Sequence, residues 1–157
     1  MSTLYVDTIT EKTSGNGVQI PGHVVQVVEG EATSDASTTS STFTATNLSA
    51  TITPSSSSNK VLAVVHGHIY TPTNNQFACD VFRGSTSITG KTAGFVEGWY
   101  ESTRGRFPVH CMLLDAPAST SALTYTLYFR SIGGGSISFP NQPASMKATI
   151  TLMEIAQ

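Results

Sequence analysis

Charged residues are scarce in this chain. Lys and Arg total 8 and Asp and Glu total 10, or 11% of the 157 residues, where an ordinary soluble domain has about 25%. The net charge is -2, and the basic residues do not cluster. A protein that binds DNA or RNA carries a basic patch for the phosphate backbone. The composition therefore argues against nucleic acid as a partner.

Long hydrophobic runs are also missing. The longest apolar runs, such as residues 61–65, are far shorter than the roughly 20 residues of a membrane-spanning helix. The N-terminus has neither the basic nor the apolar region of a secretory signal peptide. We therefore expect no membrane insertion and a chain that folds in a cytoplasm.

Cysteine is nearly absent. Cys79 and Cys111 are the only two, too few for a disulfide framework in a chain of this length. Each alternates with apolar residues of its own segment, as Phe77, Cys79 and Val81 illustrate. This pattern favours buried free thiols, with a disulfide as the alternative.

Helical periodicity is lacking throughout, whereas alternation of period two recurs between clusters of turn-forming residues. The pattern predicts an all-β fold, an antiparallel β-sandwich or jelly-roll-like domain. The expected strands are residues 4–9, 23–29, 42–46, 48–53, 60–70, 77–82, 93–100, 107–114, 122–130, 136–139 and 147–155.

Two of these strands have unusual patterns. Residues 60–70 are apolar on both faces, which predicts a strand that is central in its sheet or covered by a neighbouring subunit. In residues 147–155, Ile150 and Leu152 share one face, but Met153 and Ile155 continue on the other. A β-bulge, or a passage from core to intersubunit contact, would explain the change.

The first 22 residues form a segment of their own. They contain an alternating strand, a Ser-Gly-Asn-Gly turn and a second short apolar stretch. Two strands joined by a turn are marginally stable in water, so the segment needs a partner. We expect residues 1–22 to serve attachment or trimerisation and residues 23–157 to form the β-sandwich domain. The residues expected to make the contact are Leu4, Val6, Ile9, Val18 and Ile20.

Several stretches resemble a known class of proteins. The head LYVDTITEKTSGNGVQIPG is similar to the N-terminal signature of fibre and other virion proteins of tailed bacteriophages, particularly marine and cyanobacterial phages. The ITPSSSSNKVL link, the apolar strand after it and the closing ITLMEIAQ resemble the β-rich domain that follows such heads. The resemblance implies a homotrimer in the virion, assembled in the host cytoplasm.

The resemblance implies a short tail fibre or adhesin, with a capsid decoration protein on the head surface as the alternative. It departs in size, because long tail fibres have extended shafts and this chain has almost none. The implied partners are other copies of the chain, other tail or capsid proteins and a host surface glycan, without a cofactor. A carbohydrate-binding β-sandwich module with no virion role is the second alternative.

Catalytic motifs are not found. The sequence has no G-x-S-x-G, P-loop, H-E-x-x-H or C-x-x-C pattern. A Ser/His/Asp set can be drawn from Ser34 or Ser102 with His110 and Asp115, but it means little in a chain this rich in serine. We expect a protein that is not an enzyme, with a small hydrolase as the third function class.

The sharpest local motif is His66-Gly67-His68. Alternation places both imidazoles on one face of a strand, and a three-fold axis would gather enough of them to surround an octahedral transition metal. The simpler interpretation is a pair of hydrogen-bonded, partly covered histidines. The metal hypothesis for His66 and His68 therefore requires a trimer axis at this position.

One neighbourhood combines aromatic and basic residues. Trp99, Tyr100 and Arg104 are candidate glycan contacts, because aromatic faces pack against sugar C–H groups while polar groups bond the hydroxyls. A single Trp in a β-sandwich is more often part of the core, and we favour this interpretation for Trp99.

Overall fold

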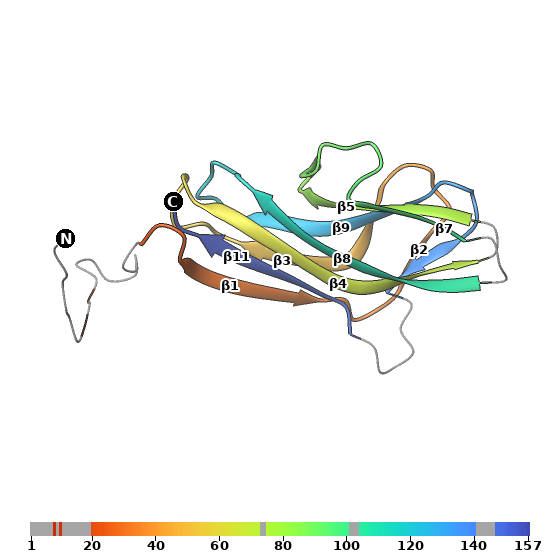
Figure 1. Cartoon of the computed structure of the whole chain (residues 1–157), viewed down its shortest axis with the longest axis horizontal. Coiled ribbons are helices and arrows are strands. Elements are labelled where there is room, and N and C mark those ends of the chain that lie inside the picture. The colour runs from red at the N-terminus through yellow and green to blue at the C-terminus, as the bar shows by residue number, and fades with distance from the viewer. Residues whose placement is uncertain (1–7, 9, 11–19, 73–74, 101–103, 141–146) are drawn as a thin grey trace, which may run out of the picture.

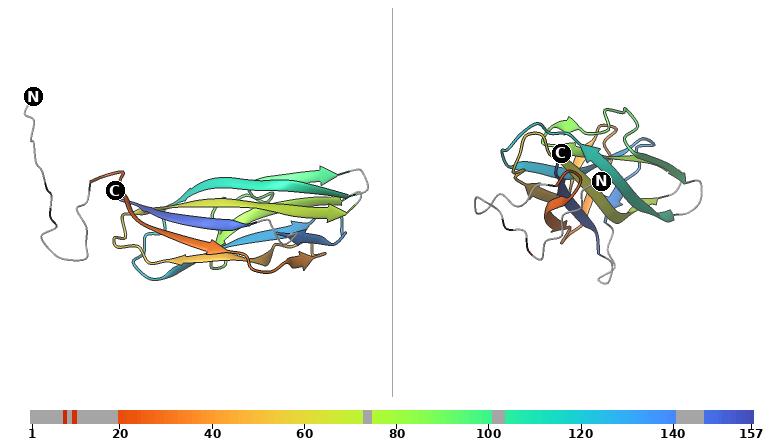
Figure 2. Two further views of the ribbon diagram at one scale, coloured as in Figure 1. Left: turned by 90° about the horizontal axis from the view of Figure 1, so that it is seen from below. Right: turned by 60° about the vertical axis from the view of Figure 1, so that its left-hand side comes forward.

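The computed structural model describes residues 8, 10, 20–72, 75–100, 104–140 and 147–157. Every helix or strand element in these ranges is a strand, and the strands form two antiparallel sheets packed face to face (Figure 1). The predicted antiparallel β-sandwich is confirmed. Figure 2 shows the two layers from the side, with the strands running along the long axis. In the described part of the chain, no helix has the length and hydrophobicity needed to cross a membrane.

One layer, sheet A, has six strands. They are β1 (Val24–Glu31), β2 (Ala36–Thr38), β4 (Lys60–Pro72), β8 (Arg104–Asp115), β10 (Ile137–Phe139) and β11 (Thr149–Ile155). The sheet runs from β1 through β11 to β4, and β10 and β2 continue it next to the far end of β4. β8 pairs with the other edge of β4 along nearly its whole length. The prediction that residues 60–70 form a central strand is therefore confirmed.

The other layer, sheet B, has five strands. They are β3 (Thr44–Ile52), β5 (Asn75–Arg83), β6 (Thr86–Ser87), β7 (Val96–Tyr100) and β9 (Leu123–Ser131). The order is β3, β9, β5, and both β6 and β7 pair with the remaining edge of β5. The separate strands predicted at 42–46 and 48–53 are one strand, β3, whose buried and exposed residues alternate without a break although its pairing with β9 shifts register between Ala45 and Ser49.

The core lies between the sheets and follows the alternation of period two. Tyr125, Leu127 and Phe129 of β9 are buried, whereas the residues between them are half-buried on the outer face. Val61 and Val65 of β4 are buried in the same core. Removing such surface from water contributes roughly 25 cal/mol per Å² and is the main force that holds the two sheets together.

Both cysteines face this core, as alternation predicts. Cys79 of β5 is buried, Cys111 of β8 is half-buried, and both are free thiols. Burial raises the pKa of both thiols, that of Cys111 to about 12. Neither thiol is therefore a reactive thiolate at neutral pH.

Of the two explanations given for residues 147–155, the bulge is wrong, and the intersubunit contact stays a prediction. β11 pairs with β4 without interruption from Thr149 to Ile155, and the irregularity lies in β1, between Val24 and Gln26. The apolar pattern changes for a different reason: Glu154 occupies a position that faces the core and is fully buried.

Glu154 is stabilised in the core by hydrogen bonds. Asn59 and Gln26 each donate a side-chain N–H to its carboxylate at 2.6 Å. Ser55 donates its backbone N–H at 2.7 Å and its hydroxyl at 2.8 Å. Burial alone would raise the pKa of Glu154, but these bonds outweigh it and hold the pKa below its ordinary value.

The two ends of the sandwich domain meet at one end of the molecule (Figure 1). The backbone N–H of Gly22 donates to the carbonyl of Ala156 at 2.8 Å, and the N–H of Ala156 donates to the carbonyl of His23 at 3.0 Å. Ile20, just before this junction, is 56% exposed. The other expected contact residues of the N-terminal segment, Leu4, Val6, Ile9 and Val18, lie outside the described residues.

A candidate interaction surface on sheet A

The outer face of sheet A carries a contiguous group of apolar side chains. The pairing of β1, β11, β4 and β8 aligns them in rows across the strands. One row is Val27, Met153, Leu62 and Leu114. The next row is Glu29, Thr151, Val64 and Met112. We call the apolar members of these rows, together with Val24 and Ile155, the sheet A patch.

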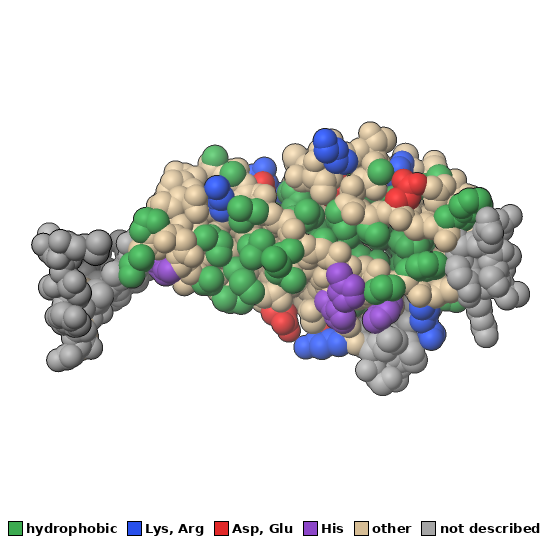
Figure 3. Space-filling model, viewed as in Figure 1, with side chains coloured by type: hydrophobic (Ala, Val, Ile, Leu, Met, Phe, Trp, Pro, Cys, Tyr) green, Lys and Arg blue, Asp and Glu red, His purple; other side chains and the backbone are tan. Residues whose placement is uncertain are grey.

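The sheet A patch is open to water. Met112 is 69%, Val27 58% and Leu114 57% exposed, and Val24 at the end of the patch is 46% exposed. Figure 3 shows hydrophobic side chains gathered over this half of the face. Single exposed apolar residues are ordinary on a soluble protein, but a contiguous group marks a surface that another molecule covers.

Three histidines lie beside the patch (Figure 3). His66 on β4 and His110 on β8 are directly paired across the strands, and their Nδ1 atoms are 3.0 Å apart. The ring centroids of His66 and His68 are 5.9 Å apart, with nearly perpendicular planes. Alternation correctly places His66 and His68 on one face, but the hydrogen-bonding partner of His66 is His110. Sequence reasoning missed it because only the pairing of β4 with β8 brings the two together.

The histidines differ in their surroundings. His66 and His110 are exposed, whereas His68 is half-buried. Burial lowers the pKa of His68, and the neighbouring His66, His110 and Arg106 lower it further. In the described part of the chain, no group of three or more His, Cys, Asp and Glu side chains is arranged to hold a metal ion.

Charge is confined to the rim of this face. The Nζ of Lys147 is 3.1 Å from an oxygen of Glu31 and 3.4 Å from an oxygen of Glu29. These hydrogen bonds raise the pKa of Lys147. Exposed pairs of this kind add little stability, and they leave the rim polar around an apolar centre.

The Ser/His/Asp set considered from the sequence is not assembled. His110 lies on the outer face of β8, whereas Asp115, five positions later, lies on the inner face. Ser34 lies in the connection between β1 and β2 and accepts a hydrogen bond from Asn47 at 2.9 Å. Ser102 lies outside the described residues.

Asp115 instead belongs to a contact between the sheets. Its carboxylate accepts a hydrogen bond from the Tyr125 hydroxyl at 2.7 Å and lies 3.1 Å from Nε of Arg83. Burial raises the pKa of Tyr125, and the bond to Asp115 raises it further. Because Asp115 is on β8 and its two partners are on sheet B, the group holds the two layers together at this end.

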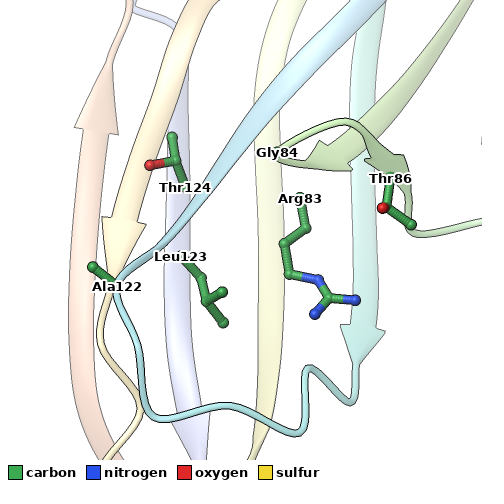
Figure 4. Close-up of a pocket in the computed structure, with 6 residues that line it drawn as sticks. All are labelled: Arg83, Gly84, Thr86, Ala122, Leu123 and Thr124. Carbon is green, nitrogen blue, oxygen red and sulfur yellow. The ribbon is translucent and has the colours of Figure 1, made fainter.

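An open pocket of about 380 Å³ lies beside this contact (Figure 4). It is lined by Arg83, Gly84, Thr86, Ala122, Leu123 and Thr124. The Arg83 guanidinium is already paired with Asp115 and donates to the carbonyl of Pro117 at 3.2 Å. The pocket therefore offers a ligand mainly hydroxyl and apolar contacts, and we assign Arg83 a structural role.

Trp99 is exposed, and the core interpretation of this residue is wrong. It lies on the outer face of β7, at an edge of sheet B, with 62% of its surface accessible. The inward position next to it is Gly98, which leaves room for Phe77. Gln76, the cross-strand neighbour of Trp99, donates a hydrogen bond to Glu97. The side chains of Tyr100 and Arg104 lie outside the described part, so the glycan contact of all three remains a prediction.

Comparison with protein-family models and with curated proteins gives no match for this sequence.

Proposed function

We propose that this protein is a structural, self-associating component of a tailed-phage particle, and that other copies of the chain cover the sheet A patch. The observation that carries the proposal is the patch itself. An exposed apolar sheet face is stabilised when it is buried, by roughly 25 cal/mol for each Å² that is removed from water.

The character of the face favours another copy as its partner. Homo-oligomer interfaces are more apolar at their centres than transient ones, and their rims are polar. The sheet A patch has this composition, with Glu29, Glu31 and Lys147 at its border. Few charges would have to lose water on association, because only 11% of the chain is charged.

The edge of sheet A adds a second means of association. Among the described residues, the strand that pairs with β8 in the sheet is β4, so the other edge of β8 is a sheet edge at Met112 and Leu114. An open edge pairs readily with a strand of another chain. Met112 and Leu114 lie on this same strand, so a neighbouring copy could use the edge and the apolar face together.

The position at which the chain enters the sandwich domain supports an attachment role for the N-terminal segment. The sandwich begins beside Val24 and Ile155, which lie at one end of the sheet A patch. Three copies that pack through the patch around an axis along the strands would bring their N-terminal segments to the same end. A short fibre component and a head-surface decoration protein both fit this arrangement, and the fibre component is our first choice.

The test is the oligomeric mass of the full chain and of a patch variant. We expect the wild-type protein to sediment as a trimer. Leu114→Glu should shift it to monomer with an unchanged circular dichroism spectrum, because the carboxylate would lose its water on association. Thr51→Glu, at an exposed position of sheet B, is the matched control and should remain trimeric. A wild-type monomer at high protein concentration, or a trimeric Leu114→Glu variant, would contradict self-association through this face.

The exposed indole of Trp99 supports the carbohydrate-binding module as the second candidate. A monomer that binds glycans on an array, with binding lost in Trp99→Ala, would favour that function. Localising the labelled chain on purified particles separates the tail from the capsid.

A further inference from the structure

The geometry points to a two-histidine chelate: we propose that His66 and His110 of one chain bind a divalent transition metal ion, with Cu²⁺ preferred and Ni²⁺ next. The site differs from the His66 and His68 pair that the sequence suggested. It needs no trimer axis and does not depend on the proposed function.

The strand pairing builds the site. His66 and His110 are direct cross-strand partners, and cross-strand side chains of an antiparallel pair lie on the same face within contact distance. Their ring centroids are 4.5 Å apart, and the rings are tilted by 42°. Both side chains are exposed, so an ion and its water ligands can reach them.

The distance between the nitrogens fits a chelate. With metal–nitrogen bonds of roughly 2.0–2.1 Å, two ligand nitrogens at a right angle are about 2.9 Å apart, and two in a tetrahedron about 3.4 Å apart. The two Nδ1 atoms are 3.0 Å apart. This separation is close to the right-angled value, which suits Cu²⁺ and Ni²⁺, and Cu²⁺ binds imidazole most strongly of the divalent first-row ions.

Protonation is compatible with binding. Without metal, one Nδ1–H donates to the other Nδ1 across the 3.0 Å gap. For both histidines to bind, each imidazole keeps its single proton on Nε2 and presents the Nδ1 lone pair to the metal. No proton is lost in this change of tautomer.

The residues around His66 and His110 limit the number of protein ligands in one chain to two. The ring centroid of His68 is 5.9 Å from that of His66, farther than the 4.5 Å that separates His66 from His110. On the other side of His66, the cross-strand neighbour on β11 is Thr149. Because no group of three ligands is found within the described residues, water completes the coordination of a single chain.

The experiment is titration of the full chain, prepared without a histidine tag, with CuCl₂ and NiCl₂. Calorimetry should give one ion per chain, and the Cu²⁺ electron paramagnetic resonance spectrum should show coupling to two nitrogens. His66→Asn and His110→Asn should each weaken Cu²⁺ binding by at least about tenfold. His68→Asn and His23→Asn, which remove histidines outside the chelate, should leave the affinity unchanged within about twofold.

The outcomes are distinct. Unaltered Cu²⁺ affinity in His66→Asn or His110→Asn, with a native circular dichroism spectrum, overturns the proposal, as does loss of binding in His68→Asn. Leu114→Glu separates the proposal from self-association. A monomeric Leu114→Glu variant that still binds one Cu²⁺ supports a chelate within one chain, whereas a monomer that has lost binding overturns it.

Discussion

At the residue scale, Glu154 shows what alternation alone cannot reveal. It occupies a position at which the alternation of β11 predicts an apolar side chain. The sequence pattern was therefore interpreted as a shift of the apolar residues to the other face of the strand. The side chains that satisfy it come from β1 and from the segment before β4, and no local pattern connects those segments. That His66 and His68 share one face was predictable, since it depends only on neighbours in the same strand.

We expect Glu154→Gln to destabilise the protein by about 1–3 kcal/mol, because the amide would direct N–H groups at donors that now bond a carboxylate. The wild-type pKa of Glu154 is lowered by folding. Its contribution to stability is therefore present above the unfolded pKa and is lost as pH falls through the folded one. Urea denaturation from pH 7 to pH 3 should show this acid loss in wild type and a flatter profile in the variant. Equal slopes would contradict the assignment.

At the element scale, most strands were predictable because half-buried strands alternate visibly. β2 and β6 were not, since their small and polar residues show no alternation of apolar side chains. The pairing of β4 with β8 was not predictable either, because strand order depends on long-range packing. The His66 and His110 site follows from that pairing, so it was hidden from the sequence although both residues were noticed.

Gly67 on β4 is fixed by packing between elements. A Cβ at this position would lie 2.6 Å from the ring of Phe139 on β10, and Phe139 is fully buried. We expect Gly67→Ala to destabilise the protein by about 1–3 kcal/mol through overpacking, measured by thermal and urea denaturation. The double variant with Phe139→Leu should recover part of the loss. If Gly67→Ala leaves the stability unchanged, β10 can move enough to accommodate the added methyl group.

At the scale of the whole molecule, the sequence predicted the sandwich but not which apolar face stays open. Both faces of residues 60–70 are apolar, so composition could not tell the core side from the sheet A patch. The apolar residues on both faces of this segment did predict a strand that is either central in its sheet or covered by a neighbouring subunit. β4 is central, and its outer face is half-buried at Leu62 and Val64.

Deleting residues 1–19 should leave the sandwich intact, because β1 begins at Val24 and the core residues all follow it. We expect an unchanged circular dichroism spectrum, a similar melting temperature and loss of incorporation into particles. Quantifying the truncated chain in purified particles provides the measurement. Normal incorporation would contradict the attachment role of the segment.

The backbone bonds of Ala156 with Gly22 and His23 have a practical consequence for labelling. Because they hold the two ends of the sandwich domain together, a fluorescent protein or affinity tag fused after Gln157 would emerge beside the N-terminal segment. Such a fusion would interfere sterically with the N-terminal segment, which we expect to attach the chain to the particle. An insertion in the exposed turn at Gly84 and Ser85, which joins two strands of sheet B, would place the same label on the layer opposite the sheet A patch.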